Sequence, residues 1–311
     1  MFYRYYGPRY VGRFGAGRRE VDKPITVGIA KSLTNVKDEK IHAYKHLIKC
    51  KVLIVDESHT VPTETLLSVC NGICKNVPYR YFVSGTQTRN DGSELLLKGL
   101  IGPIVGKLTV QDLVDKSFIS KPIFKMFNII SESAYSSAEA LAMIRKHYLY
   151  NEKVYEKAAF LANKFVGEMG FPVLILLDEL EQYKLISPLL KFDHKFAFGG
   201  NVDGFEGIKK ENPTKLVEQF NNLEYPILIG TDCISMGTNV LPVQAVILIK
   251  GGKSEIRFRQ AVGRGLRKVP GKDFCYIIDF NIENIPMLNR HAMERKRIYE
   301  SIYPPVNIIN D

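Results

Sequence analysis

Two short stretches of this sequence carry charged side chains at spacings that could support phosphate chemistry. An apolar run over 52–55 leads directly into two adjacent carboxylates, Asp56 and Glu57. Carboxylates at a strand end can hold hydrated Mg²⁺ and orient a water molecule toward a phosphate. Farther along the chain, Arg264 and Arg267 lie three residues apart, so on a helix both guanidinium groups can reach one anion. The two stretches together predict a phosphoryl-transfer site.

Each stretch also has a simpler interpretation. Asp56 and Glu57 could cap a following helix and face solvent, because acidic groups are favourable near a helix N-terminus. Arg264 and Arg267 could be surface residues of a helix over 255–266. A cleft-lining arginine is costly unless an anion pairs with it, which favours phosphate or a structural carboxylate as its partner.

Short aliphatic runs alternate with helical patterns along most of the chain. Continuous apolar runs of this length are typical of strands buried on both faces of a parallel sheet, with the periodic segments as crossover helices. The fold class predicted is therefore α/β. The predicted strands cover 24–27, 52–55, 80–83, 172–177, 226–229, 245–249 and 274–278, and the clearest predicted helices cover 152–168 and 179–190.

A domain boundary is expected near residue 120, after a short helix over 110–118. The predicted division is a first domain over 1–120, a second over 121–285, and a basic helix with a tail over 286–311. The first domain offers only about three strands before residue 104, fewer than a full nucleotide-binding domain needs. We therefore expect part of that domain to be encoded upstream.

Composition narrows the class of partner and compartment. The 311 residues carry a formal net charge of +10 with a pI near 9.2, which favours a polyanion such as nucleic acid. Membrane association is not expected, because no apolar run approaches the roughly 18 residues of a span and the start has no signal-like apolar core. Five scattered cysteines without a Cys-x-x-Cys pair argue against zinc binding and fit a reducing, cytoplasmic setting. The six histidines are dispersed, and only His59 stands in a motif.

In order and spacing, these motifs resemble those of the superfamily 2 helicases over about residues 20–300. The segment 56–59, Asp-Glu-Ser-His, matches the DExH form of the acidic box, and 84–86, Ser-Gly-Thr, stands where the family carries a Ser-Ala-Thr-like motif. The segment 25–33 resembles the one that contacts the DNA backbone, although Ile and Ala replace its usual Thr-Pro. The segment 227–239 resembles motif V, and 260–267, Gln-x-x-Gly-Arg-x-x-Arg, resembles the final arginine motif.

The resemblance implies roles for individual residues. Asp56 would hold Mg²⁺ through water, Glu57 would orient the attacking water, and Arg264 would reach the γ-phosphate with Arg267 beside it. The remaining nucleotide-binding positions implied are His59, Gly237, Asn239 and Gln260, and the positions implied for nucleic-acid contact or coupling are Gly28, Lys31, Ser84, Thr86 and Thr231.

The function implied by the resemblance is that of an ATP-dependent DNA helicase or translocase. ATP and Mg²⁺ would bind between two RecA-like parallel-sheet lobes, the first of them truncated at its N-terminus. The subgroup resembled is the phage type that acts on branched or recombining DNA, in host cytoplasm if phage-encoded. Single-stranded or branched DNA is the expected partner, RNA stays an alternative, and the oligomeric state cannot be read. The rival interpretation is an ATPase-deficient nucleic-acid-binding fragment or regulatory product of a helicase.

One expected motif does not occur in the 311 residues. A phosphate-binding loop needs Gly-x-x-x-x-Gly-Lys-[Ser/Thr], because backbone amides and a lysine must surround the phosphates. The glycine-rich, basic segment 12–19 lacks that string and is interpreted as a loop, near DNA phosphate. At the other end, 289–299 is predicted to be a basic helix with either a solvated charged face or a DNA contact.

Overall fold

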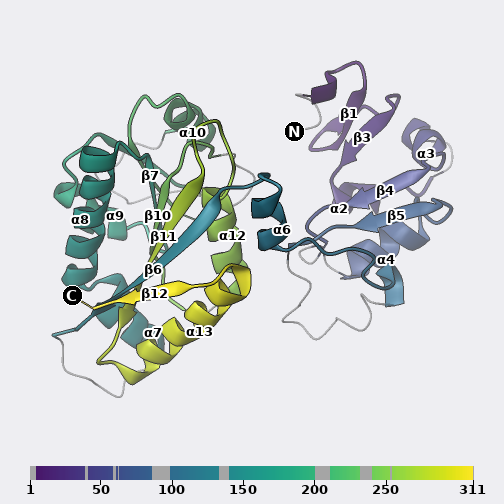
Figure 1. The fold of residues 1–311 in the computed structure, drawn as a ribbon. Coiled ribbons are helices and arrows are strands. Elements are labelled where there is room, and N and C mark those ends of the chain that lie inside the picture. The colour runs from purple at the N-terminus through teal and green to yellow at the C-terminus, as the bar shows by residue number, and fades with distance from the viewer. Residues whose placement is uncertain are drawn as a thin grey trace. The chain divides into compact units, whose positions relative to one another are not determined.

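The computed structural model describes residues 5–38, 41–58, 61, 63–85, 99–132, 140–199, 211–231, 240–252 and 254–310, with backbone alone at 140, 256 and 257. Contacts between residues divide the chain into two units, Met1–Lys107 and Leu108–Asp311 (Figure 1). The division falls earlier than the predicted boundary near residue 120. Residues at the predicted boundary already pair with the second unit: Ile119 forms a β-bridge with Arg267, and the Ser120 amide donates to the Leu266 carbonyl at 2.8 Å.

The second unit is built on a seven-stranded sheet in the order β12-β6-β11-β10-β7-β9-β8, and every pairing in it is parallel. Strands that are consecutive in sequence are joined in this parallel sheet by crossover connections and not by hairpins. The strands are β6 (Lys121–Ile129), β7 (Val173–Leu177), β8 (His194–Ala197), β9 (Ile227–Gly230), β10 (Ala245–Ile249), β11 (Phe274–Ile282) and β12 (Val306–Ile309).

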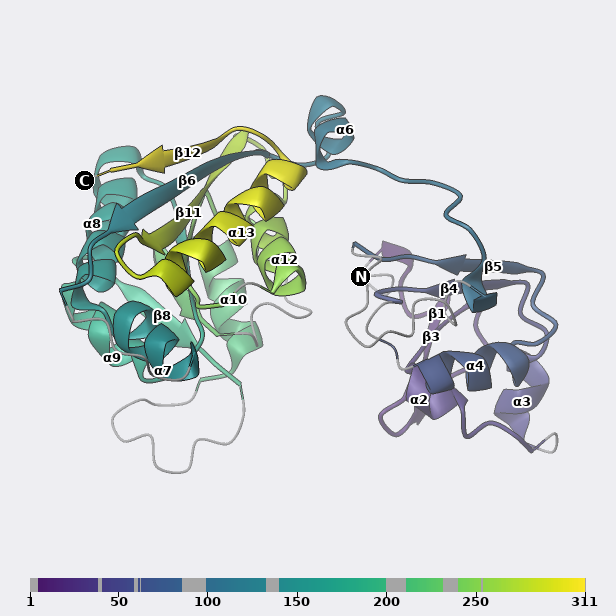
Figure 2. The ribbon, with the colours of Figure 1, turned by 90° about the horizontal axis from the view of Figure 1, so that it is seen from below.

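Helices cover both faces of this sheet (Figures 1 and 2). The face carrying α7 (Ala140–Ile144), the π-helical turn Arg145–Leu149, α8 (Glu152–Met169) and α9 (Gln182–Ile186) forms one core, and the face carrying α10 (Pro213–Asn221), α12 (Glu255–Gly265) and most of α13 (Pro286–Ile302) forms the other. Two further short helices are α6 (Val110–Asp115) and the 3-10 turn Ser187–Leu189. Among the described residues, no helix is both long and apolar enough to cross a bilayer.

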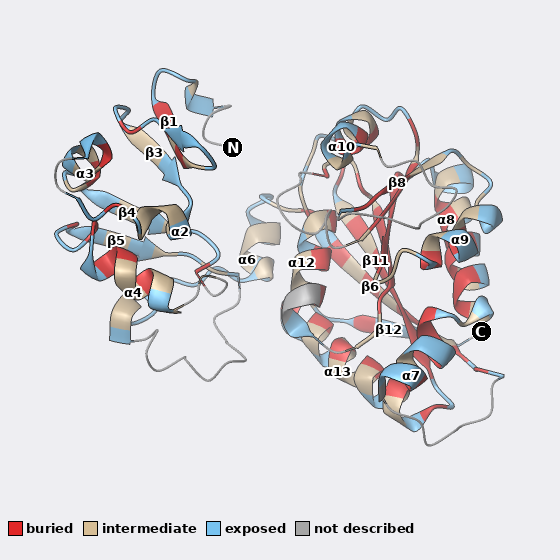
Figure 3. Ribbon diagram, turned by 180° about the vertical axis from the view of Figure 1, so that it is seen from behind, coloured by how far each residue is buried: buried red, intermediate tan, exposed pale blue. Residues whose placement is uncertain are grey.

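Strand β7 shows why the central strands could be predicted. Side chains alternate along a strand, so Val173 and Ile175 enter the core under α8, while Leu174 and Leu176 enter the core under α10 and α12. All five residues of β7 and of β10 are buried, as Figure 3 shows for the centre of the sheet. The parallel α/β prediction for this unit is therefore confirmed. The edge strands β8 and β12 and the long strand β6 were not predicted.

The first unit contains two separate small sheets. A three-stranded sheet has the order β2-β1-β3, and a two-stranded parallel sheet joins β4 and β5. A small core that includes Phe14, Val36 and Leu47 lies beneath its helices. The elements are β1 (Val11–Gly15), β2 (Arg18–Arg19), β3 (Ile25–Gly28), α2 (Ala30–Leu33), α3 (His42–Leu47), β4 (Val52–Val55), α4 (Thr63–Asn71) and β5 (Tyr79–Phe82).

The prediction of a loop over 12–19 was wrong, because this segment forms the antiparallel hairpin of β1 and β2. Gly15, Ala16 and Gly17 take positive φ values of 117°, 49° and 80° at its turn, which glycine allows readily. A Cβ on Gly12 would lie 2.1 Å from the Glu20 carbonyl oxygen. The glycines that suggested a loop are thus the ones that let the hairpin close.

Burial on both faces, predicted for every strand, is also wrong for β4 and β5. Both strands alternate between exposed and half-buried residues. Val52, Ile54, Tyr79 and Tyr81 are between 49% and 60% exposed, and the neighbouring Val83 is 52% exposed. One face of this two-stranded sheet is therefore an apolar surface in contact with solvent.

A fully buried ion pair lies within the second unit. Arg295 of α13 contacts both carboxylate oxygens of Asp279 in β11, at 2.7 and 3.2 Å, and also donates to the Phe280 carbonyl at 2.7 Å. Tyr148 and Tyr299 donate their hydroxyls to the same carboxylate at 3.1 and 2.8 Å. Burial, together with the Asp279 charge, raises the pKa of both phenols well above its usual value, so both stay protonated donors.

Arg295 also connects this pair to the segment before α12. Its third nitrogen donates to the Gly252 carbonyl at 3.1 Å, and its guanidinium carbon lies 5.4 Å from the centre of the Phe258 ring. Within the segment predicted as a solvated or DNA-facing basic helix, Arg295 is thus a core residue that fixes α12 and α13 together.

We expect Asp279→Asn to lower the free energy of unfolding of the second unit by about 3–5 kcal/mol, because it leaves the buried Arg295 charge without its counterion. Asp273→Asn is the matched control, since Asp273 pairs with Lys268 at 3.4 Å on the surface and is 85% exposed. That change should cost less than about 1 kcal/mol. Urea unfolding followed by circular dichroism measures both, and equal effects would contradict the assigned role.

Candidate functional site

The acidic motif lies where two parallel strands of the first unit end. Val55 of β4 is paired with Phe82 of β5, and the Val83 amide donates to the Val55 carbonyl at 2.8 Å. The ladder continues past the strands, because the Ser58 amide donates to the Val83 carbonyl at 3.1 Å. Ser84, which follows Val83, therefore lies beside the acidic turn, as the order of the two motifs predicts.

The acidic turn presents its two carboxylates to solvent. Asp56 and Glu57 are exposed, whereas Ser58 behind them is 3% exposed. Glu57 has a φ of 48°, a left-handed conformation that is uncommon for residues other than glycine, and its amide donates to Asp56 Oδ1 at 2.9 Å. Adjacent carboxylate oxygens are the ligands that Mg²⁺ prefers. The arrangement suits Asp56 as a Mg²⁺ ligand through water, with the exposed Glu57 carboxylate beside it as the group to orient a second water.

Two of the residues predicted at this edge, His59 and Thr86, lie outside the described residues. Gly28 ends β3, which belongs to the other sheet of the same unit, and Lys31 lies in the helix α2 that follows it. Both are exposed, and β3 pairs with β1. In the first unit, Asp56, Glu57 and Ser84 thus come together at one sheet edge, whereas Gly28 and Lys31 are exposed positions of other elements.

In the second unit, α12 divides its residues between the core and a polar face. Phe258, Ala261 and Val262 are 1% exposed and pack on the sheet. Gln260 and Arg264, which are four residues apart and so lie on one side of the helix, are half-buried. The predicted helix over 255–266 is confirmed, and its residues alternate between core packing and a face that holds the predicted nucleotide-binding side chains.

The backbone at the end of this helix is anchored by a buried lysine. Lys272, which is 2% exposed, donates from Nζ to the Arg267 carbonyl at 2.8 Å and to the Leu241 carbonyl at 3.3 Å. Burial lowers the pKa of Lys272 to about 8 and also lowers the pKa of the half-buried Arg267. With the β-bridge from Ile119 to Arg267, these contacts hold the second arginine at a defined position.

The two glycines of the arginine motif have different surroundings. A Cβ on Gly265 would lie 2.8 Å from both Cys275 Sγ and Val246 Cγ2, so this glycine permits close packing of α12 on β10 and β11. A Cβ on the exposed Gly263 would meet no atom within 4 Å. Because Val246 and Cys275 are the second residues of their strands, the arginine end of α12 lies at the amino end of the large sheet.

The other motif of this unit begins at the opposite end of the sheet. Thr231 follows the carboxyl end of β9, and its amide donates to the Ala197 carbonyl at 3.4 Å. Gly237 and Asn239 lie outside the described residues. Among the described residues, Gln260 and Arg264 therefore share one side of α12, Arg267 follows the end of that helix, and Thr231 lies at the opposite end of the sheet.

The sequence analysis missed a buried polar side chain, Gln182, beyond the end of β7. Gln182 is fully buried, accepts from the amides of Asp178 and Glu179 at 2.8 and 2.7 Å, and donates to Tyr155 and to the Ile249 carbonyl at 2.9 and 3.2 Å. It caps the turn after β7, which is why α9 begins at residue 182 and the helix predicted from 179 is shorter.

Asp279 is a second buried polar residue that the sequence analysis missed. It continues an apolar run and was placed beyond the predicted strand over 274–278, although a polar residue inside such a run is a signal of buried pairing.

Comparison with known proteins finds a family match within the second unit. Residues 157–269 match the helicase conserved C-terminal domain. The ATP-dependent DNA helicase uvsW of Enterobacteria phage T4 is 21% identical over 309 residues, which are 95% of this chain and 58% of that protein. The DNA 3'-5' translocase XPB2 of Sulfurisphaera tokodaii is 21% identical over 251 residues, 71% of this chain and 56% of that protein.

A solved structure has the same fold. S. cerevisiae Dbp5, in complex with Gle1 and IP6, superimposes with a TM-score of 0.61 over 97% of this chain and 69% of that one, at 13% identity. At this identity the likeness concerns the fold, and it supports the predicted α/β, RecA-like architecture. The chain spans between 51% and 58% of the length of three curated relatives that it matches.

The different surroundings of the two glycines predict different responses to substitution. Gly265→Ala should destabilise the second unit by about 1–3 kcal/mol, because its methyl group would be forced into the β10–β11 surface. Gly263→Ala, the matched control on the same helix, should be neutral or stabilising by up to about 1 kcal/mol through helix propensity. Denaturant unfolding followed by circular dichroism tests both, and a larger loss for Gly263→Ala would show that the packing is assigned to the wrong glycine.

Proposed function

This chain belongs to the superfamily 2 helicases, and from that membership we propose that it is the ATP-dependent core of a DNA helicase or translocase. The observation that carries the proposal is the polar face of α12. Gln260 and Arg264 share that face, Arg267 follows the end of the helix, and both arginines are half-buried. Half-buried guanidinium groups on an anchored helix are suited to bind a phosphate group, because the helix need not reorganise when the anion binds.

The acidic turn of the first unit supplies the complementary chemistry. When bound, Mg²⁺-ATP provides the phosphoanhydride that is cleaved, with the metal neutralising charge on the phosphates. Asp56 would hold the Mg²⁺ through water, and Glu57 would orient the attacking water. Arg264 would then stabilise negative charge on the γ-phosphate, with Arg267 beside it. The remaining assignments are Gln260, His59, Gly237 and Asn239 toward nucleotide, and Gly28, Lys31, Ser84, Thr86 and Thr231 toward nucleic acid and coupling.

DNA is the proposed nucleic acid, in replication, recombination or repair of the phage type. The net charge of +10 supports a polyanionic partner, and one matching relative is named as a DNA helicase of phage T4 and another as a DNA translocase. Single-stranded or branched DNA is the proposed form. RNA is the alternative within the same site, because phosphate contacts do not distinguish the two.

A second candidate function is nucleic-acid binding without ATP turnover. Two observations favour it. The 311 residues contain no Gly-x-x-x-x-Gly-Lys-[Ser/Thr] string, and the apolar face of β4 and β5, with Ile54 59% and Tyr79 60% exposed, is a surface of the kind that another polypeptide covers. In this interpretation the acidic turn and the arginines become active only with a phosphate loop supplied by further polypeptide.

ATP hydrolysis with and without single-stranded DNA distinguishes the two candidates. If the chain is a helicase core, we expect ATP turnover that DNA stimulates. The turnover should be slow, because the 311 residues contain no phosphate-binding loop. Glu57→Gln and Arg264→Ala should reduce that turnover to background, since an arginine finger contributes roughly 10³-fold or more. Arg259→Ala is the matched control on α12: Arg259 is engaged by Glu255 at 2.7 Å and Ser301 at 2.8 Å, and its loss should leave turnover intact.

Each outcome of this experiment has a defined meaning. If the chain binds DNA and its ATP turnover equals that of Glu57→Gln, the second candidate holds and the helicase proposal fails for this chain alone. If Arg264→Ala and Arg267→Ala both keep the full rate, α12 is structural and the assignment of its arginines is wrong. Substitution by lysine should restore little activity, because a point charge does not reproduce the planar guanidinium.

A further inference from the structure

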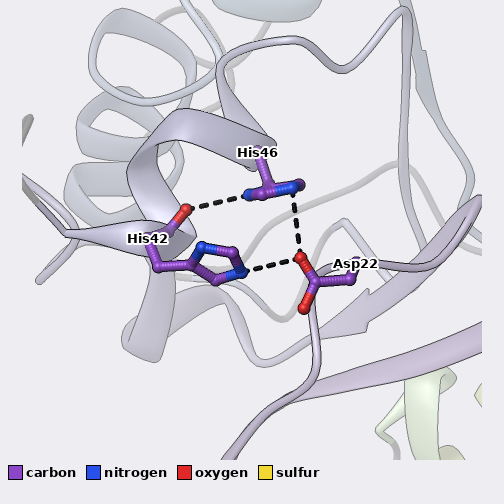
Figure 4. A group of neighbouring side chains, drawn as sticks. All are labelled: Asp22, His42 and His46. Carbon is purple, nitrogen blue, oxygen red and sulfur yellow. Dashed lines mark hydrogen bonds and ion pairs between the residues drawn. The ribbon is translucent and has the colours of Figure 1, made fainter.

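Three side chains of the first unit converge on one point away from the acidic turn. His42 and His46 are four residues apart on α3, so both project from one side of that helix. Asp22 comes from the segment between β2 and β3, twenty residues earlier than His42. Figure 4 shows the three side chains pointing toward one another, with the Asp22 carboxylate facing both imidazole rings. From this arrangement we propose that Asp22, His42 and His46 bind a divalent transition-metal ion, with Zn²⁺ as the best match.

The distances between the three groups suit a shared ion. Asp22 Oδ1 lies 2.7 Å from His42 Nε2 and 3.1 Å from His46 Nε2, and one ligand atom from each residue lies within 4.8 Å of the other two. Zinc binds imidazole nitrogen at about 2.0–2.1 Å and carboxylate oxygen at about 2.0–2.2 Å. Tetrahedral ligands at those bond lengths are separated by roughly 3.3–3.5 Å, so a small side-chain rotation opens the cluster enough to admit the ion.

The hydrogen bonding of His46 fixes which nitrogen faces the cluster. His46 Nδ1 lies 3.1 Å from the His42 carbonyl oxygen. A carbonyl oxygen can only accept, so Nδ1 carries a proton and Nε2 is the nitrogen that faces Asp22, where it can present a lone pair to a metal ion. Either a proton on Nε2 or a metal ion between the two groups makes this contact with the Asp22 carboxylate attractive. Donation of the second ring nitrogen to a backbone carbonyl is also the usual arrangement around a metal-bound histidine.

Buried neighbours hold the three ligands in place. Val21, Ala43 and Leu47, each next in sequence to one of the ligands, are between 4% and 6% exposed and belong to the same core cluster. The backbone of each ligand is therefore fixed by packing before any ion binds. The ligand side chains are 38–63% exposed, so an ion can enter and water can complete its coordination.

The choice of ligands separates this site from the acidic turn. Two imidazole nitrogens and one carboxylate favour Zn²⁺, Co²⁺, Ni²⁺ or Cu²⁺, whereas Mg²⁺ prefers an all-oxygen set such as that of Asp56. An ion here would connect the segment between β2 and β3 to α3, which are twenty residues apart in the sequence. Such a connection would stabilise the first unit, because the ion binds the folded state and has no equivalent site in the unfolded chain.

Titration of the metal-free chain with Co²⁺, followed by visible absorption, tests the site without any enzyme assay. We expect one Co²⁺ per chain with a ligand-field band typical of nitrogen and oxygen ligands, and displacement by Zn²⁺. His42→Ala, His46→Ala and Asp22→Asn should each weaken binding at least about tenfold, as loss of a ligand costs no less than loss of an outer partner. Zn²⁺ should also raise the melting temperature of the wild-type chain and leave that of His42→Ala unchanged.

Cys50→Ser is the matched control, because Cys50 is a half-buried thiol of the same unit and could otherwise account for metal binding. Burial raises the pKa of Cys50, so it stays a thiol, and its substitution should leave Co²⁺ affinity unchanged. Absence of Co²⁺ binding up to millimolar concentration would overturn the proposal and leave protons as the cations between these groups. Undiminished affinity in both histidine variants would equally overturn it.

Discussion

The buried pair of Asp279 and Arg295 determines the geometry of the second unit. A charged pair in a core is tolerated when its oxygens and N–H groups have partners, and here two tyrosine hydroxyls and two backbone carbonyls add to the contacts of the pair itself. Because Arg295 also reaches Gly252 and the Phe258 ring, this one contact orients α12 relative to β11 and α13. The arginine motif lies on α12, so a structural ion pair deep in the core sets the direction of residues proposed to bind phosphate.

The same helix shows how packing and chemistry are combined in one element. Its core face is apolar and closely packed, which requires glycine at 265, and its other face carries Gln260 and Arg264. Lys272 anchors the final turn through the Arg267 carbonyl. In the first unit, a parallel strand pair has a comparable effect, because two strands that end together bring Asp56 and Ser84 to one edge. Both arrangements place charged groups on backbones that are already fixed, which lowers the reorganisation needed when a ligand binds.

The sequence predicted those parts of the structure that follow from local pattern. Strands β7, β9 and β10 are apolar throughout because helices cover both faces of the sheet. Their continuous apolar runs therefore predicted buried strands. Edge strands such as β8, His194–Ala197, lack that signal because one side has no neighbour. The glycines of the 12–19 hairpin suggested a loop. The cluster of Asp22, His42 and His46 was not predicted from the sequence. Only the tertiary packing of α3 brings Asp22 next to the two histidines.

Both proposed functions require this chain to bind nucleic acid through the phosphate backbone. Fluorescence anisotropy of labelled single-stranded and forked DNA of unrelated sequences, at increasing salt concentration, measures this directly. Binding should weaken steeply with salt, with log K falling linearly in log[salt] and a slope near −0.7 per phosphate contact on single strands. The slope should be the same for every sequence. No binding at low salt, an affinity insensitive to salt, or strong preference for one base sequence would contradict the account.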